Sequence, residues 1–174
     1  MRSILFLTLD TNRGIHGAVV RRILVVEDDR LVSETIRTAF LMKGGFEVDC
    51  AEDGEAGLVA LADGNLDLAL VDYGLPKVPG LIVAKRAVAR NIPTILMTGY
   101  GDEIAKLEED QFPVLAKPFS VAELVASFEQ VVAEAKRLNE IAQRFVEQGF
   151  VLNATHRVLS DEWLRICERL RRTS

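Results

Sequence analysis

Cysteine and histidine are scarce in this chain. Two of each occur in 174 residues, and neither pair has the spacing of a metal site. Cys50 and Cys167 lie far apart in the sequence, which is typical of small apolar side chains in a reduced cytoplasm. The composition therefore argues against a secreted protein held by disulfides and against a metal site built from cysteine or histidine.

Long hydrophobic runs are also absent. The first apolar run, Ile4 to Leu7, is too short for the core of a signal peptide and is soon followed by Asp10. A membrane-spanning helix needs about 20 predominantly apolar residues, and no stretch of the sequence comes near that. We therefore expect no secretion signal, no membrane span and a cytoplasmic location.

The overall composition is that of a soluble globular protein. The chain is 49% hydrophobic and 27% charged, and its length fits one domain with an appendage. Its net charge of −5 argues against a general nucleic-acid coat. Residues 1–135 carry 13 basic and 21 acidic side chains, whereas residues 136–174 carry 8 and 5. The tail is therefore expected to differ in character from the body.

Apolar runs alternate with helical patterns from residue 21 onward. Ile23 to Val26 and Leu68 to Val71 are unbroken apolar runs, which are typical of strands covered on both faces. The predicted strands are 23–26, 46–50, 67–72, 94–97 and 114–116, and the predicted helices are 31–42, 51–63, 81–89, 102–109 and one that starts after Ser120. This alternation predicts an α/β fold with a doubly wound, five-stranded parallel sheet.

Capping residues mark the ends of two of these helices. Asp29 is well placed to cap the helix 31–42, which Gly44 and Gly45 would stop. Ser120, with Glu123 three residues later, forms the capping box of the last helix.

Polar side chains stand at four of the predicted strand ends. They are Glu27 and Asp28, Asp72, Thr98, and Lys117. In a doubly wound sheet these ends meet in one crevice, which is where such folds bind their ligands. We therefore expect these side chains to form one site.

The chemistry of this site follows from its charges. Three carboxylates at close range repel one another, raise the pKa of at least one, and need a cation. Hard oxygen ligands in a partly open shell favour Mg²⁺. With Asp72 as nucleophile, and with Lys117 and the Thr98 hydroxyl as donors to phosphoryl oxygens, the pattern indicates phosphoryl transfer.

Together these residues resemble the receiver domain of bacterial two-component response regulators, the CheY-like superfamily, over roughly residues 21–135. The matching pieces are Val-Val-Glu27-Asp28, Val-Asp72 with Leu75-Pro76, Met-Thr98-Gly and Lys117-Pro118-Phe119. The resemblance implies a flavodoxin-like fold with strand order 2-1-3-4-5. It also implies that the protein is a signalling phosphoprotein rather than an enzyme.

The family further implies how phosphorylation would occur. Asp72 would accept a phosphoryl group from the phosphohistidine of a sensor histidine kinase or phosphotransfer protein. Mg²⁺ would be held by Asp28, Asp72 and the backbone carbonyl of Gly74, with Glu27 acting through water.

Two further positions carry the family's switch. Lys117 would contact the phosphate, and Thr98 would move toward it. The Lys117–Pro118 bond would be cis. The signal would then be relayed by a conformational change, through protein–protein contacts.

Some positions depart from the usual receiver pattern. Val114 stands where receivers commonly have an aromatic residue, so rotation of that ring cannot be the relay. The segment from Pro93 to Tyr100 partly resembles the Phe-Ala-Thr-Gly-Tyr subfamily of stand-alone receivers, and Tyr100 is either its shielding residue or an ordinary packed tyrosine. The helix 102–109 has few apolar anchors and is predicted to be mobile.

The predicted boundaries leave two segments outside the receiver. Residues 1–20 form a loose leader, residues 21–136 the receiver domain, and residues 137–174 a helical extension. Apolar residues recur with four-three spacing from Leu124 to Phe145, so the last helix would outrun the domain and be followed by a second one. This hairpin either caps its own receiver or pairs two protomers into a homodimer. Its arginines leave DNA contact open, although no recognition helix is evident, and docking of a kinase is a third option.

Two other functions stay open on the sequence alone. A haloacid-dehalogenase-type phosphohydrolase also forms an aspartyl phosphate, but it needs an Asp where this chain has Gly74. A degenerate receiver would act unphosphorylated, as a binding module, although every acceptor-site residue is present.

Overall fold

Alternating strands and helices make up the described part of the chain. The computed structural model describes residues 21–62, 65–90, 92–99 and 112–147, with side chains to residue 135 and at 137. The strands are β1 (Arg21–Val26), β2 (Phe46–Ala51), β3 (Leu68–Asp72), β4 (Thr94–Thr98) and β5 (Val114–Ala116), and the helices are α1 (Arg30–Lys43), α2 (Gly54–Ala62), α3 (Gly80–Val88) and α5 (Val121–Glu147). Every predicted element within these ranges is present.

The strands form one parallel sheet. Its order is β2-β1-β3-β4-β5, and each neighbouring pair is parallel. This confirms the predicted doubly wound sheet and its flavodoxin-like order. β1 and β3 lie side by side in the centre, with Val26 paired to Val71, so the residues that follow β1 emerge beside the end of β3.

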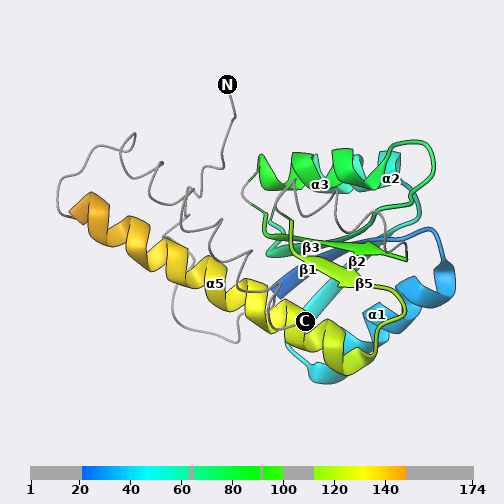
Figure 1. Cartoon of the computed structure of the whole chain (residues 1–174), viewed down its shortest axis with the longest axis horizontal. Helices are drawn as coiled ribbons and strands as arrows, with labels where there is room; N and C mark the ends of the chain where they lie inside the picture. The colour runs from blue at the N-terminus through cyan, green and yellow to red at the C-terminus, as the bar shows by residue number, and fades with distance from the viewer. Residues whose placement is uncertain (1–20, 63–64, 91, 100–111, 148–174) are drawn as a thin grey trace.

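Helices cover both faces of the sheet (Figure 1), with α2 and α3 on one face and α1 and α5 on the other. Leu24 and Val26 of β1 pack into the core under α2 and α3, while Ile23 and Val25 pack into the core under α1 and α5. Successive strand residues point to opposite faces, so a strand buried on both sides must be apolar at every position. The unbroken apolar runs of the sequence are explained by these two cores.

The predicted ends of α1 are confirmed and the predicted start of α2 is wrong. The Asp29 carboxylate accepts hydrogen bonds from the backbone N–H groups of Leu31 and Val32, and Gly44 ends the helix with a φ of 78°. Ala51 belongs to β2, and α2 begins only at Gly54, because Asp53 caps it by accepting from the N–H of Ala56.

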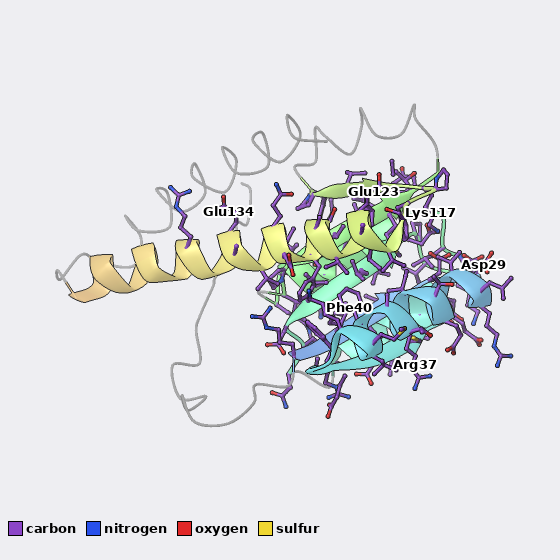
Figure 2. The ribbon with its side chains drawn as sticks, turned by 90° about the horizontal axis from the view of Figure 1, so that it is seen from below. Asp29, Arg37, Phe40, Lys117, Glu123 and Glu134 are labelled. Carbon is purple, nitrogen blue, oxygen red and sulfur yellow. The ribbon has the colours of Figure 1, made fainter. Side chains whose placement is uncertain are left out.

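Helix α5 extends beyond the sheet, as the four-three pattern predicted (Figure 1 and Figure 2). It has 27 residues, which at 1.5 Å per residue is about 40 Å. Phe128 anchors its first half, with ring centroids 5.1 Å from Phe40 and 5.2 Å from Phe46. The helix therefore packs on the domain through its first turns and continues past residue 136.

Several predictions fall outside the described residues. They concern the leader 1–20, the helix 102–109 with Tyr100, and the second helix of the tail beyond residue 147. In the described part of the chain, no helix combines the length and hydrophobicity that crossing a bilayer requires.

The capping box of α5 yields a pH-dependent prediction. The Glu123 carboxylate accepts from the backbone N–H and the hydroxyl of Ser120, and these bonds lower the Glu123 pKa below its usual 4.5. A lowered carboxyl pKa stabilises the fold above pH 4.5 and ceases to do so as the pH falls through the lowered value. We expect Ser120→Ala to cost about 1 kcal/mol of unfolding free energy at neutral pH.

Urea unfolding checks this at two pH values. The difference between wild type and Ser120→Ala should narrow as the pH falls from neutral through the lowered Glu123 pKa, because Glu123 then becomes protonated in the folded chain as well as in the unfolded chain. Glu47→Gln, which changes an exposed acid on β2, is the control. An undiminished difference at low pH would contradict a contribution from the ionised carboxylate.

Candidate functional site

Four strand ends supply the candidate site. Glu27 follows β1, Asp72 is the last residue of β3, Thr98 is the last residue of β4 and Lys117 follows β5. The sheet keeps them at one edge, because all strands are parallel and the Lys117 N–H donates to the Thr98 carbonyl at 2.7 Å. Glu27, Asp72 and Thr98 are buried. The predicted residues are thus gathered by the strand register.

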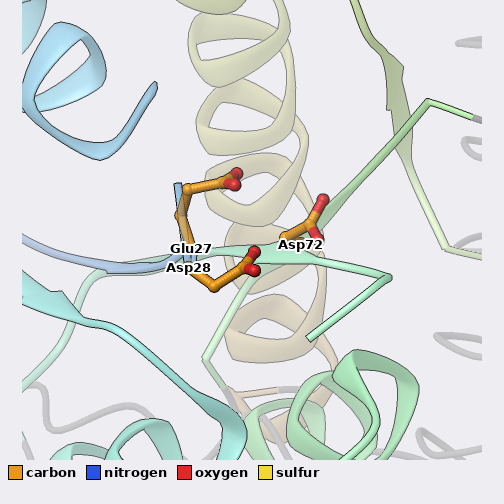
Figure 3. A group of neighbouring side chains, drawn as sticks. All are labelled: Glu27, Asp28 and Asp72. Atoms are coloured by element: carbon orange, nitrogen blue, oxygen red, sulfur yellow. The ribbon is translucent and has the colours of Figure 1, made fainter. Parts of the chain in front are cut away.

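The side chains of Glu27, Asp28 and Asp72 form an acidic cluster (Figure 3). One carboxylate oxygen from each lies within 4.8 Å of the others, and Asp28 is the exposed member. Mg²⁺ prefers oxygen ligands, takes one or two carboxylates and keeps several waters. A set of hard oxygens with one side open to solvent fits that preference. The donor chemistry therefore suits Mg²⁺ better than a softer metal.

Lys117 pairs with two of the three acids. Its Nζ lies 2.6 Å from Glu27 Oε2 and 2.7 Å from Asp72 Oδ1. The sequence predicted Lys117 as a phosphate ligand and left compensation of the carboxylates to a metal ion. In the structure the lysine ammonium already offsets part of their charge.

Burial raises the pKa of Glu27, whereas for Lys117 it opposes the rise in pKa that hydrogen bonds cause. The Glu27 pKa is raised, first by burial and then by repulsion from Asp72, against the lowering effect of Lys117. The predicted rise in one carboxyl pKa is thus confirmed, but its largest cause is burial. For Lys117 burial favours the neutral amine, yet hydrogen bonds to Asp72 and Glu27 outweigh it and raise the pKa. The lysine is therefore cationic at neutral pH.

Both carboxylate oxygens of Asp72 are engaged. Oδ1 faces Lys117, and Oδ2 accepts from the Gly74 N–H at 3.0 Å. Gly80 packs against the Asp72 main chain so closely that a Cβ there would lie 1.8 Å from the Asp72 carbonyl oxygen. Only glycine fits at this position without moving the backbone. The carboxylate is thus held in one orientation by its own loop.

An apolar groove lies beside the site, and sequence reasoning missed it. It has a volume of about 470 Å³ and is lined by Leu31, Val32 and Thr35 of α1 and by Lys117, Pro118 and Phe119. Leu31 is 80% exposed, although it is a large apolar residue at the end of α1 nearest the site. The only sequence signal was that Leu31 falls outside the apolar stripe of its helix.

Sequence reasoning also missed an ion pair between α2 and the loop after β3. Lys77 Nζ lies 2.5 Å from Asp53 Oδ2, and Asp53 is buried. The residues are 24 positions apart, and no local pattern connects them.

Two details bear on the other predictions. The Lys117–Pro118 bond is cis, as the family resemblance implied. Val114 is partly buried against the core under α2 and α3, and it presents no ring to rotate.

Comparison with known proteins identifies the same family that the sequence motifs resemble. The model of the response regulator receiver domain matches residues 23–129. The phosphate regulon transcriptional regulatory protein PhoB of Klebsiella pneumoniae is 33% identical over an alignment of 154 residues, and the match covers 83% of this chain and 66% of PhoB. The transcriptional regulatory protein QseB of Haemophilus influenzae is 32% identical over an alignment of 116 residues, and the match covers 64% of this chain and 52% of QseB. The chain thus spans less than two thirds of these relatives.

Solved structures of related proteins show the same fold. The response regulator TrrA of Thermotoga maritima, solved in complex with Mg²⁺-BeF, has a TM-score of 0.58 and 30% identity, and covers 64% of this chain and 98% of its own. A CheY-like receiver domain from Methanospirillum hungatei has a TM-score of 0.61 over 68% of this chain and 98% of its own, and at 24% identity it supports the fold alone. Over the span that the family model matches, this chain belongs to the response regulator receiver domain family of two-component signalling proteins.

Proposed function

We propose that this receiver accepts a phosphoryl group on Asp72 from a phosphohistidine-bearing protein and relays the signal by a change of conformation. The observation that carries the proposal is the setting of the Asp72 carboxylate. It lies in a cluster of acids, between the Lys117 ammonium and the Gly74 N–H. The relative solved with Mg²⁺-BeF supports the choice of chemistry.

The transfer is a displacement at phosphorus. A carboxylate oxygen of Asp72 forms the new O–P bond, and the P–N bond to the donor's histidine breaks, so that the imidazole leaves as a neutral ring once it is protonated. The Lys117 ammonium is held 2.7 Å from Asp72 Oδ1, so it would stabilise the negative charge of the phosphoryl oxygens there. The Thr98 hydroxyl would donate to the same oxygens and thereby report the modification.

Asp28, Asp72 and the Gly74 backbone carbonyl would hold Mg²⁺, with Glu27 acting through water. The ion would supply positive charge to the phosphoryl oxygens and help to align them. Glu27 and Lys117 have a separate task, because their pairing keeps a buried carboxylate compensated whether or not the ion is bound.

The relay would begin at the strand ends. Thr98 is the last residue of β4 and Lys117 is the first residue after β5. A new contact of either side chain with the phosphoryl group would therefore act directly on the end of its strand. The receiver would comprise residues 21–136, and residues 137–174 a helical extension that caps its own receiver or pairs two protomers. We infer a phosphoacceptor rather than an enzyme, because a haloacid-dehalogenase-type general acid is lacking at Gly74.

The donor protein would dock in the groove beside the site. The groove combines exposed Leu31 with Pro118 and Phe119, and Lys117 is both one of its walls and a partner of Asp72. A protein that brings a phosphohistidine to Asp72 would lie close to this surface, and an apolar patch gives it a place to bind.

Substitution of the acceptor tests the proposed function. With acetyl phosphate and Mg²⁺, intact-mass spectrometry of the wild type should show the mass of one added phosphoryl group. Asp72→Asn should show none, because an amide is a far weaker nucleophile than a carboxylate. An equal gain in both proteins would place the phosphoryl group elsewhere.

Substitution of Asp28 tests the metal site. Asp28→Asn removes one charge from the acidic cluster, so the Mg²⁺ concentration for half-maximal phosphorylation should rise about tenfold or more, which is about 1.4 kcal/mol or more. Asp29→Asn is the matched control, because asparagine also caps a helix and Asp29 lies outside the cluster. The proposal of a metal site fails if both variants need the same Mg²⁺ concentration as the wild type.

A substitution in the groove separates donor docking from chemistry. For a donor protein that phosphorylates the wild type, Leu31→Glu should lower the rate of phosphorylation about tenfold. The reason is that the loss of a central apolar contact costs roughly 1–2 kcal/mol or more. The rate of this variant with acetyl phosphate should not change. Met42→Glu is the control, because Met42 is 83% exposed on the same helix but near its far end. An equal loss with acetyl phosphate would mean that Leu31 acts on the site itself.

A further inference from the structure

The loop between β3 and α3 is fastened to the start of α2. Its residue Pro76 accepts a hydrogen bond from the Gly54 N–H at 3.3 Å. The Val78 carbonyl packs so closely on Gly54 that a Cβ there would lie 2.1 Å from its oxygen. This loop carries Gly74, whose N–H holds Asp72. The start of α2 is therefore the support on which the loop of the acceptor residue rests.

One ion pair completes the fastening. Asp53 uses both of its carboxylate oxygens, since Oδ1 accepts from the Ala56 N–H at 2.8 Å and Oδ2 lies 2.5 Å from Lys77 Nζ. Asp53 is only 5% exposed. A carboxylate so buried requires a partner, and Lys77 is the cation that meets it. Glu55 Oε2 lies farther from Lys77 Nζ, at 3.9 Å.

The backbone at Lys77 is strained. Its φ is +64°, in the left-handed region that residues other than glycine rarely adopt. A lysine persists there only where the surroundings fix it, and the bond to Asp53 is the contact of its side chain that does so. A glycine would suit this backbone better and could not reach Asp53. The lysine is therefore explained by its tether and not by its turn.

We propose that the Asp53–Lys77 pair positions the β3–α3 loop so that Gly74 presents its main chain to the acidic cluster, and thereby sets the Mg²⁺ affinity of the site. This inference rests on the proposed function. Asp53 and Lys77 are positioning residues, because neither belongs to the acidic cluster and they act through the loop. Groups that orient metal ligands from outside the ligand shell change metal affinity by about 10- to 100-fold when they are removed.

The test compares Mg²⁺ requirement with maximal rate in the full chain. Two quantities are measured for wild type, Lys77→Met, Lys77→Arg, Lys77→Gly and Asp53→Asn: Mg²⁺ binding to the unphosphorylated protein by isothermal titration calorimetry, and phosphorylation by acetyl phosphate as a function of Mg²⁺. Asparagine at 53 keeps the acceptor for the Ala56 N–H and removes only the charge. We expect Lys77→Met and Asp53→Asn to need about tenfold more Mg²⁺, with the maximal rate reached at saturating Mg²⁺ little changed. Lys77→Arg should restore most of the affinity.

Two comparisons distinguish positioning from stability or turn geometry. Lys77→Gly relieves the backbone strain but loses the tether, so it should behave like Lys77→Met; a wild-type Mg²⁺ requirement in Lys77→Gly would overturn the inference. Lys43→Met removes an ion pair of similar length, Lys43 to Glu129 at 2.7 Å, between α1 and α5, and should leave the Mg²⁺ requirement unchanged. An equal shift in Lys43→Met would also overturn it, because any loss of stability would then suffice.

The outcome for the wild type separates this inference from the proposed function. If the wild type is phosphorylated and Lys77→Met needs no more Mg²⁺ than it does, the pair is structural only and the inference fails alone. If the wild type takes up no phosphoryl group at any Mg²⁺ concentration, the proposed function fails and the inference fails with it.

Discussion

Negative charge collects at the carboxyl edge of this sheet, and the arrangement of the site follows from how that charge is compensated. Glu27 is buried beside Asp72, and burial makes its ionised form costly. The Lys117 ammonium reaches both carboxylates and makes the cluster compatible with a folded chain. A protein that lost Lys117 would keep its two cores and still have buried carboxylates to neutralise. The lysine is thus part of the stability of the fold as well as of its proposed chemistry.

Compensation of this kind requires strand ends that do not drift. The two cores supply that rigidity, because they pack on opposite faces of the sheet. In β1, for example, Val25 lies in one core and Val26 in the other. Close approaches of the backbone add to it. Gly80 against the Asp72 carbonyl and Gly54 against Val78 leave no room for a Cβ, so the loop after β3 has one way to lie. The site is precise where the backbone is crowded.

Most of the fold could be predicted because its signals are local. Apolar runs such as Ile23 to Val26 indicate strands, and Asp29 and Ser120 indicate where helices begin. The gathering of Asp28, Asp72 and Lys117 could also be predicted, since parallel strands end at one edge. The start of α2 could not, because Ala51 continues an apolar pattern while its backbone still pairs with β1. The Asp53–Lys77 pair and the groove at Leu31 depend on contacts between distant segments, and no sequence period reports those.

The covalent path from the site to the start of α5 is short. Lys117, which pairs with Asp72, is followed by Pro118 and Phe119 in the groove wall and then by Ser120, the cap of α5. α5 then runs past the sheet (Figure 1). Adjacency along the chain is not by itself coupling, because a signal requires two arrangements that a phosphoryl group stabilises unequally. The segment from Lys117 to Ser120 bears on the second part of that requirement: Lys117 contacts Asp72 directly, so the phosphoryl group proposed for Asp72 would change the charge that this lysine faces close to the start of α5.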